Sequence, residues 1–421
     1  MCGIDRESYV TQAVDVVEEA GSEAAFRDAL VDKLLADGMI TAPAVESAFR
    51  RVPRATFTPT GTPLEVVYNA DDAVTTKKDE YGVVISSVSA PFIQAQMIEQ
   101  AEIEPGMSVL EVGSGGYNAA LLAEVVGPDG LVVSMDIDKD VTDRAKAALA
   151  EAGYSERVRV VLGDAEHGVP DIEHFDRIIV TVGAWEIAPS WLEQLADGGR
   201  IVLPLRMKGV TRTIAFRRDG DRLISTSAQV AGFVAMQGDG AHAEKVYELP
   251  DGHGRAIKLR FDDGKLEHPH LLDKVLATER KAVWSGVTIG RSTSFATLHL
   301  WFASFLDGFC RIAADDGISM ADEGESWFPF GAVRDDSFAY LAVRPAADGV
   351  EFGALAYGLH AEEAGQALAE QIQAWDEIAR NGPAPAFGVY PINIDRSAFP
   401  ERTGVVTKDH SLITISWPAA G

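Results

Sequence analysis

The chain has 421 residues, 47% of them hydrophobic, which is enough for two packed cores, and its formal net charge is −27. Nucleic-acid binding draws its affinity from clustered Lys and Arg, so this charge argues against a nucleic-acid partner. The two cysteines, Cys2 and Cys310, cannot form a disulfide framework, and the sequence has neither a basic-then-apolar leader nor a run of about 18 uncharged apolar residues. These features predict a cytoplasmic protein with free thiols and no membrane contact.

The first part of the chain predicts a helical lead-in followed by a long loop. Apolar residues recur at helical spacing from Phe26 to Leu35, and a second short helix is expected from Ala42 to Arg50. Between Pro53 and Pro91 polar clusters interrupt the pattern, which is typical of a structured surface loop. Loops of this length are often functional.

From Gly106 onward, short apolar strands alternate with amphipathic helices. This alternation predicts an α/β fold with a doubly wound, mostly parallel sheet. The expected strands are 108–112, 130–136, 158–162, 177–182 and 200–204, and the expected helices are 119–126, 141–152 and 190–195. A turn is expected at ADGG, before the last of these strands, and the β-rich segments 213–228 and 230–237 are expected to form an antiparallel hairpin that closes the sheet.

The turn-rich segment LPDGHG, residues 249–254, is interpreted as a domain boundary. It gives a first domain over residues 1–248 and a second, α+β domain over residues 255–421. A helix is predicted from about Ala361 to Arg380, where its apolar face stops at NGP. We expect the second domain either to recognise a substrate or to form a homodimer, with its aromatic-rich stretches serving as ordinary core.

The segment VLEVGSGGYNAALLA, residues 109–123, places glycines where a backbone approaches a ligand and leads into a helix N-terminus. A dinucleotide enzyme would show Gly-x-Gly-x-x-Gly. Here Asn118 occupies the third glycine position and Glu111 precedes the turn, and both features favour S-adenosylmethionine over NAD.

Two aspartates follow the next strands of the predicted sheet. Asp136 lies 23 residues after Gly113, where a carboxylate can accept hydrogen bonds from both ribose hydroxyls of an adenosine ligand. Asp164, after the third strand, is placed to accept from an adenine amino group. Either residue alone fits an ordinary turn, but their positions at successive strand ends indicate one pocket.

Several ordered segments resemble the protein-L-isoaspartate (D-aspartate) O-methyltransferase family. They are residues 30–59, the segment SVSAPFI at 87–93 and the block at 175–205, and the similarity extends over about residues 29–240. The resemblance implies a Rossmann-like class I methyltransferase domain with a helical N-terminal lead-in. It also implies S-adenosyl-L-methionine as cofactor, S-adenosyl-L-homocysteine as product, and no metal.

The resemblance implies roles for individual residues. Ser89 falls on the active-site serine, and Ser87 and His167 are further catalytic candidates, although a Ser in a loop or a His in a turn is by default merely solvated. The implied cofactor-binding residues are Val88, Glu111, Gly113, Ser114, Gly115, Tyr117, Asp136, Ile137, Gly163, Asp164, Ala165 and Thr181. The implied substrate-binding residues are Val182, Gly183 and Gln237. His268 and His270 alternate as metal ligands would, but lack further ligands at metal-site spacing.

The chain departs from the family in two places. The glycine turn is one residue shorter than the usual Gly-x-Gly-x-Gly, and VTTKKDEYGVVISS, residues 74–87, stands where the repair enzymes have a short loop. With the added domain, this pattern resembles large actinobacterial homologues that accompany ribosomally made modified peptides such as lanthipeptides and graspetides. The implied substrate is such a peptide, esterified on an Asp side chain, with the ester collapsing to aspartimide and in part to isoaspartate.

An aspartate side chain has a reference pKa of about 3.9, so it attacks a sulfonium methyl without a general base, and alignment is the enzyme's main task. The alternatives are a repair methyltransferase acting on isoaspartyl residues, a small-molecule O-methyltransferase, and a catalytically idle binding protein. Activity on an isoaspartyl peptide would identify a repair methyltransferase, and failure to bind S-adenosylmethionine would favour an idle binding protein.

Overall fold

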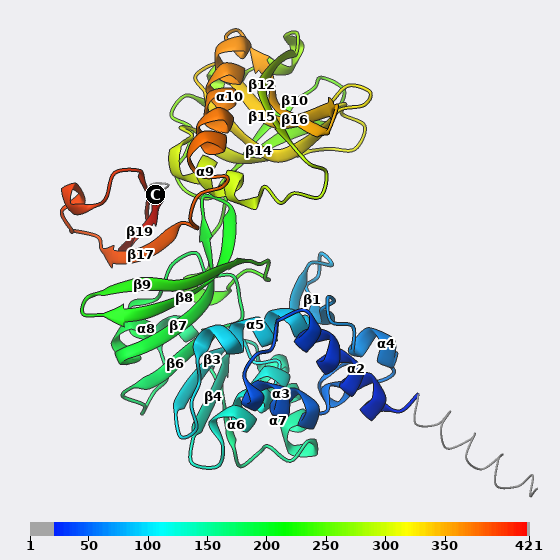
Figure 1. Cartoon of the computed structure of the whole chain (residues 1–421), viewed down its shortest axis with the longest axis vertical. Coiled ribbons are helices and arrows are strands. Elements are labelled where there is room, and N and C mark those ends of the chain that lie inside the picture. The colour runs from blue at the N-terminus through cyan, green and yellow to red at the C-terminus, as the bar shows by residue number, and fades with distance from the viewer. Residues whose placement is uncertain (1–20, 419–421) are drawn as a thin grey trace, which may run out of the picture. The chain divides into compact units, whose positions relative to one another are not determined.

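The computed structural model describes residues 21–418, which divide into two compact units (Figure 1). Unit 1 comprises the described chain up to Leu205 together with Arg212–Gly220 and Thr226–Ala241. Unit 2 comprises Arg206–Thr211, Asp221–Ser225 and the described chain from His242. Within the described chain, no helix is long and apolar enough to cross a membrane.

The predicted helical lead-in is present in unit 1. Helix α2 spans Glu23–Ala36 and begins with Ser22, whose hydroxyl accepts a hydrogen bond from the Ala25 N–H. Helix α3 spans Pro43–Arg51, with proline at its first position, where the missing N–H is not needed. Both helices bury an apolar face.

The segment expected to be a long loop contains regular structure. After η1 (Arg54–Phe57) and α4 (Leu64–Val67), strands β1 (Val74–Lys78) and β2 (Val84–Val88) form an antiparallel hairpin. Its turn is closed by the Asp79 side chain, which accepts from the N–H groups of Tyr81 and Val83. The polar composition of this segment concealed the strands. The hairpin accounts for most of residues 74–87, where the sequence departs from the family.

The predicted doubly wound sheet is confirmed. Strands β7, β6, β3, β4 and β5 lie side by side in that order, each parallel to its neighbour. The strands span Ser108–Val112 (β3), Leu131–Asp136 (β4), Val158–Leu162 (β5), Phe175–Val180 (β6) and Leu195–Met207 (β7). The helices of this region span Pro91–Ala101 (α5), Tyr117–Val126 (α6), Lys139–Glu151 (α7) and Pro189–Gln194 (α8). Because right-handed crossovers join β3 to β4 and β4 to β5, α6 and α7 cover the same face.

Two details of the sheet differ from the prediction. The segment ADGG is part of β7, where it forms an irregular stretch opposite β6, because Gly198 adopts a left-handed φ of 70° and lets the strand bulge. The closing hairpin consists of β8 (Val210–Asp219) and β9 (Arg222–Val230), joined at Gly220. The segment after Val230 was expected to be the second strand, but it makes only an isolated bridge to Gly183.

Unit 2 contains a seven-stranded antiparallel sheet in the order β10-β11-β13-β14-β15-β16-β12. Its strands span Lys245–Pro250 (β10), Ala256–Phe261 (β11), Lys281–Ile289 (β12), Phe309–Ala314 (β13), Ser326–Arg334 (β14), Ser337–Ala346 (β15) and Gly349–Gly358 (β16). Helix α10 (Ala361–Ile378) lies close to the predicted bounds and packs on β12, β15 and β16 (Figure 1). The remaining elements are α9 (Ala296–Phe305) and the strands Ala386–Pro391 (β17), Thr403–Thr407 (β18) and Ser411–Ser416 (β19).

The division of the chain lies elsewhere than the sequence suggested. LPDGHG leads from β10 into β11 as the connection of a hairpin inside unit 2, and the chain passes for the last time from unit 1 to unit 2 between Ala241 and His242. A glycine-rich turn inside a hairpin and a linker between domains have the same local composition, so the sequence could not distinguish them.

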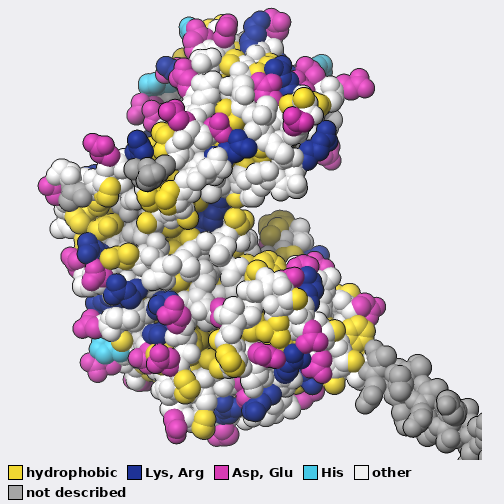
Figure 2. All heavy atoms as spheres, viewed as in Figure 1, with side chains coloured by type: hydrophobic (Ala, Val, Ile, Leu, Met, Phe, Trp, Pro, Cys, Tyr) yellow, Lys and Arg dark blue, Asp and Glu magenta, His cyan; other side chains and the backbone are white. Residues whose placement is uncertain are grey.

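Cys310 is buried and free, whereas Cys2 lies outside the described residues. Figure 2 shows Lys and Arg interspersed among Asp and Glu over the visible face.

Candidate cofactor and acceptor site

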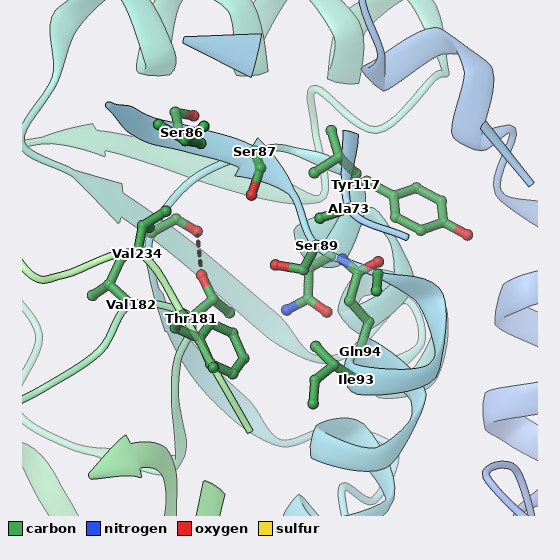
Figure 3. Close-up of a pocket in the computed structure, with 18 of the residues that line it drawn as sticks. Ala73, Ser86, Ser87, Ser89, Ile93, Gln94, Tyr117, Thr181, Val182 and Val234 are labelled. Atoms are coloured by element: carbon green, nitrogen blue, oxygen red, sulfur yellow. Dashed lines mark hydrogen bonds between the residues drawn. The ribbon is translucent and has the colours of Figure 1, made fainter. Parts of the chain in front are cut away.

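A cavity of about 810 Å³ in unit 1 lies at the carboxyl ends of the parallel strands. Its wall combines the turn after β3, the hairpin strand β2, the start of α5 and the segment after β9 (Figure 3). The predicted residues that line it are Val88, Ser87, Ser89, Glu111, Gly113, Ser114, Gly115, Tyr117, Asp136, Thr181 and Val182. The fold therefore brings most of the predicted cofactor residues and both candidate serines to one cavity.

The turn after β3 requires glycine at two positions. Gly113 has φ of 96°, and a Cβ there would overlap the hydroxyl of Thr181, which donates to the carbonyls of Val112 and Gly113. Gly116 has φ of 83°, and a Cβ there would lie 3.0 Å from the Phe57 ring. The turn thus exposes backbone to the cavity and directs the N-terminus of α6 toward it, as a ligand-binding turn does.

Glu111 is a fully buried acid on β3. The Ser134 hydroxyl donates a hydrogen bond to its carboxylate and lies 2.8 Å from the Ser114 hydroxyl. Burial raises the pKa of Glu111 to about 7, against the hydrogen bond from Ser134 and the nearby Asn118 amide, which favour the charged form. A cationic group bound in the cavity would favour ionisation of this carboxyl, so Glu111 fits the ammonium of an amino-acid ligand.

Asp136 ends β4 with its carboxylate held in a fixed orientation. One oxygen accepts from the Ser114 N–H and the other from the Asp138 N–H, both at 2.9 Å. Burial raises the pKa of this carboxyl, and the same two N–H groups oppose that shift. Each carboxylate oxygen has a further lone pair, so Asp136 can still accept from two adjacent hydroxyls such as those of a ribose.

A second, smaller cavity of about 50 Å³ continues from Asp136 and is lined by Ile137, Asp164, Ala165 and Gln237. The Asp164 carboxylate accepts from the N–H groups of Glu166 and Asp239. The second of these bonds fastens η3 (Gly238–Gly240) beside the cavity. These residues suit an adenine ring, with one carboxylate at the edge and apolar side chains around it.

Three predicted site residues, Gly163, Gly183 and His167, line neither cavity. Gly163 supports Asp136 through an N–H bond of 3.0 Å to its carbonyl. The N–H of Gly183 donates to the Val234 carbonyl, and its carbonyl accepts from the Met236 N–H, so both backbone groups pair with residues 234–236 of the same chain. His167 does not line either cavity, and its exposed ring pairs with Asp239 at 3.0 Å.

The three neighbouring serines are not equivalent. Figure 3 shows the Ser87 hydroxyl directed from β2 into the cavity, whereas Ser86 lies on the opposite side of the strand. The Ser86 hydroxyl is 2.8 Å from that of Thr76 and accepts from Arg144. The Ser89 carbonyl is bound by Arg54. Ser86 also lines the cavity, but its hydroxyl is engaged by Thr76 and Arg144, so Ser87 and Ser89 are the better placed to meet an acceptor.

Sequence reasoning missed several residues of this site. Arg54, Gln94 and Thr75 contribute to or support the wall, and Val230–Val234 completes it. Arg54 lies in the segment RVPRATFTP, where an arginine between apolar residues is the one available signal. Its hydrogen-bond partners lie 13 to 40 positions further along the chain, so the tertiary fold brings them together.

A model of the family "Protein-L-isoaspartate(D-aspartate) O-methyltransferase (PCMT)" matches residues 25–240, more than half of the chain. A protein-L-isoaspartate O-methyltransferase of Thermotoga maritima is 39% identical over 173 residues, which are 41% of this chain and 53% of that relative. The match therefore spans about half the length of that relative. A relative from Korarchaeum cryptofilum is 35% identical over 219 residues, which are 50% of this chain and 96% of its own length.

Solved structures of proteins with the same name also align. One covers 89% of this chain and 98% of its own, with a TM-score of 0.49 and 22% identity. Another, from Plasmodium falciparum in complex with S-adenosyl-L-homocysteine, covers 50% of this chain and 97% of its own, with a TM-score of 0.43 and 17% identity. On the family match and the sequence relatives, this chain belongs to the protein-L-isoaspartate(D-aspartate) O-methyltransferase family of S-adenosylmethionine-dependent carboxyl methyltransferases.

Proposed function

We propose that this protein transfers a methyl group from S-adenosylmethionine to the free carboxylate of an isoaspartyl residue in a peptide or protein. The observation that carries the proposal is the single cavity in which Glu111, Gly113 and Asp136 lie opposite the loop bearing Ser87 and Ser89. Family membership supports the same reaction. When bound, S-adenosylmethionine supplies a sulfonium methyl, and the reaction forms an O–C bond as the S–C bond breaks.

The residues of the acceptor side suit a carboxylate that is already ionised. Among the described residues that line the cavity, none is Lys or Arg, and the neutral polar side chains there include Ser87, Ser89 and Gln94. Neutral donors orient an anion without strongly stabilising it, which leaves its nucleophilicity intact. No proton transfer is needed, so His167 on the exposed surface is not required as a base.

A second candidate substrate is an ordinary Asp in a ribosomally made, modified peptide. The observation that favours it is the β1–β2 hairpin, which supplies Thr75, Val84 and Ile85 to the cavity wall. In this case the following backbone nitrogen attacks the ester, methanol leaves and an aspartimide closes. We further propose that the protein acts in the cytoplasm, and that unit 2 recognises the peptide or forms a homodimer.

Two synthetic peptides of identical sequence, one with isoaspartate and one with Asp, test these candidates by mass spectrometry with S-adenosylmethionine. A methyl ester on the isoaspartyl peptide alone supports the main proposal. A methyl gain followed by net loss of water on the Asp peptide alone supports the second candidate. If neither peptide is methylated, the main proposal is wrong.

A further inference from the structure

Arg54 is a fully buried cation in unit 1 whose hydrogen-bond acceptors are all neutral. Its Nε donates to the Val67 carbonyl at 2.7 Å, and its Nη1 donates to the Gln94 side chain at 2.9 Å. Its Nη2 donates to the carbonyls of Ser89 at 2.8 Å and Val88 at 3.4 Å. Burial lowers the pKa of this guanidinium to about 10, which leaves it charged at neutral pH.

The same guanidinium lies over the ring of Tyr117, 4.9 Å from its centre. Tyr117 is the first residue of α6, directly after the glycine turn, and it lines the cavity. Val88, Ser89 and Gln94 line the cavity from the acceptor side. Arg54 itself is not among the lining residues, so it connects the two sides from behind the wall.

A buried charge is expensive to desolvate, and a structural role alone would be served by an apolar side chain. Only arginine offers five N–H donors in a planar fork that can also stack on an aromatic ring. The guanidinium of Arg54 donates along its edges to the four acceptors, and its face lies over the ring of Tyr117. Through these contacts Arg54 joins the segment Val88–Ser89 to the start of α6.

We propose that Arg54 is a positioning residue that fixes the segment Ser87–Ser89, at the end of β2, relative to the glycine turn, and so holds the acceptor in line with the bound methyl donor. The inference rests on the proposed carboxyl methyl transfer. Misplacement of reacting groups by about 1 Å costs on the order of 100-fold in rate. Loss of Arg54 therefore lowers kcat strongly and changes binding of S-adenosylmethionine little.

The test compares Arg54→Lys with Arg177→Lys in the full chain. Arg177 also donates to backbone carbonyls, those of Ala101 and Glu102, but it lies at the start of β6, at the opposite end of the parallel strands. For Arg54→Lys we expect kcat on the isoaspartyl peptide to fall about 100-fold. We expect the Kd of S-adenosylmethionine by calorimetry to change less than about threefold, and amide hydrogen exchange at residues 88–94 to accelerate. Arg177→Lys should alter none of these readouts.

Wild-type kcat and wild-type exchange in Arg54→Lys would overturn the inference, and so would equal losses of cofactor binding, stability and kcat. If Arg54→Lys does not fold, Gln94→Leu removes one acceptor and should lower kcat with unchanged cofactor binding; unchanged kcat would overturn the inference. Hydrogen exchange needs no substrate. If the wild-type protein methylates no peptide, the proposed function fails while exchange still decides whether Arg54 orders the loop.

Discussion

Above pH 7 the ionised carboxyl of Glu111 destabilises the folded state, and the same ionised form suits a bound ammonium group. Because its folded pKa of about 7 lies above the ordinary value of 4.5, its contribution to stability is complete below pH 4.5 and is lost as the pH rises through 7. Glu111→Gln removes this penalty, so we expect the variant to gain up to about 3 kcal/mol over wild type at pH 8 and little at pH 5. Thermal unfolding at both pH values measures the difference, and a gain independent of pH would contradict it.

The same carboxyl should make cofactor binding depend on pH. An ammonium bound beside Glu111 favours its ionised form, so binding below pH 7 must release a proton. We expect the Kd of S-adenosylmethionine to rise by up to about tenfold per pH unit as the pH falls below 7. Calorimetry from pH 6 to 8 measures this dependence. Glu111→Gln should bind more weakly at pH 8 and lose the dependence, whereas a flat wild-type profile would show that Glu111 does not sense the ligand.

The β1–β2 hairpin is tied to the cofactor side of the cavity. Lys77 on β1 pairs with Asp138 at 2.6 Å and Asp140 at 2.8 Å, and Arg144 of α7 donates to Thr76. These ion pairs and hydrogen bonds fix one wall of the acceptor side to the loop that also positions Asp136. The hairpin tip, by contrast, presents an aromatic side chain to solvent.

Tyr81 at this tip is 84% exposed, which favours a contact with a bound peptide. Tyr81→Ser should raise the KM of the peptide severalfold and leave the Kd of S-adenosylmethionine unchanged. Stability should change by less than about 0.5 kcal/mol, as for surface substitutions in general. Leu131→Ser is the control, because Leu131 is also exposed, at 40%, but lies at the start of β4, at the opposite end of the parallel strands from the cavity. Equal KM values for wild type and Tyr81→Ser would exclude the tip from peptide binding.

Hydrophobic patterning predicted β3 and β4, which are continuous buried runs, and α10, which buries one face. It failed where backbone geometry or tertiary contacts decide: the polar strands β1 and β2, the bulge at Gly198 and the segment after Val230, which makes only an isolated bridge to Gly183. In the site, Gly113, Glu111 and Asp136 were predictable because strand ends fix their positions. Arg54 was not, because its partners come from four separate segments.

For the whole molecule, the net charge of −27 creates a field that attracts cations. We expect kcat/KM for an isoaspartyl peptide flanked by Lys or Arg to fall as ionic strength rises, because salt screens this attraction. A peptide flanked by Asp or Glu should show the opposite trend. Steady-state rates over a range of NaCl concentrations measure both, and identical salt profiles would show that the field does not steer the substrate.

Esterification of a peptide carboxylate by unit 1 can be tested by locating the transferred methyl group. The protein is incubated with S-adenosylmethionine carrying an isotopically labelled methyl group and an isoaspartyl peptide, and tandem mass spectrometry assigns the label. We expect a base-labile methyl ester on the isoaspartyl carboxyl group, absent with Asp136→Asn. Label on an amine or hydroxyl, or no label with a protein that binds S-adenosylmethionine, would contradict it.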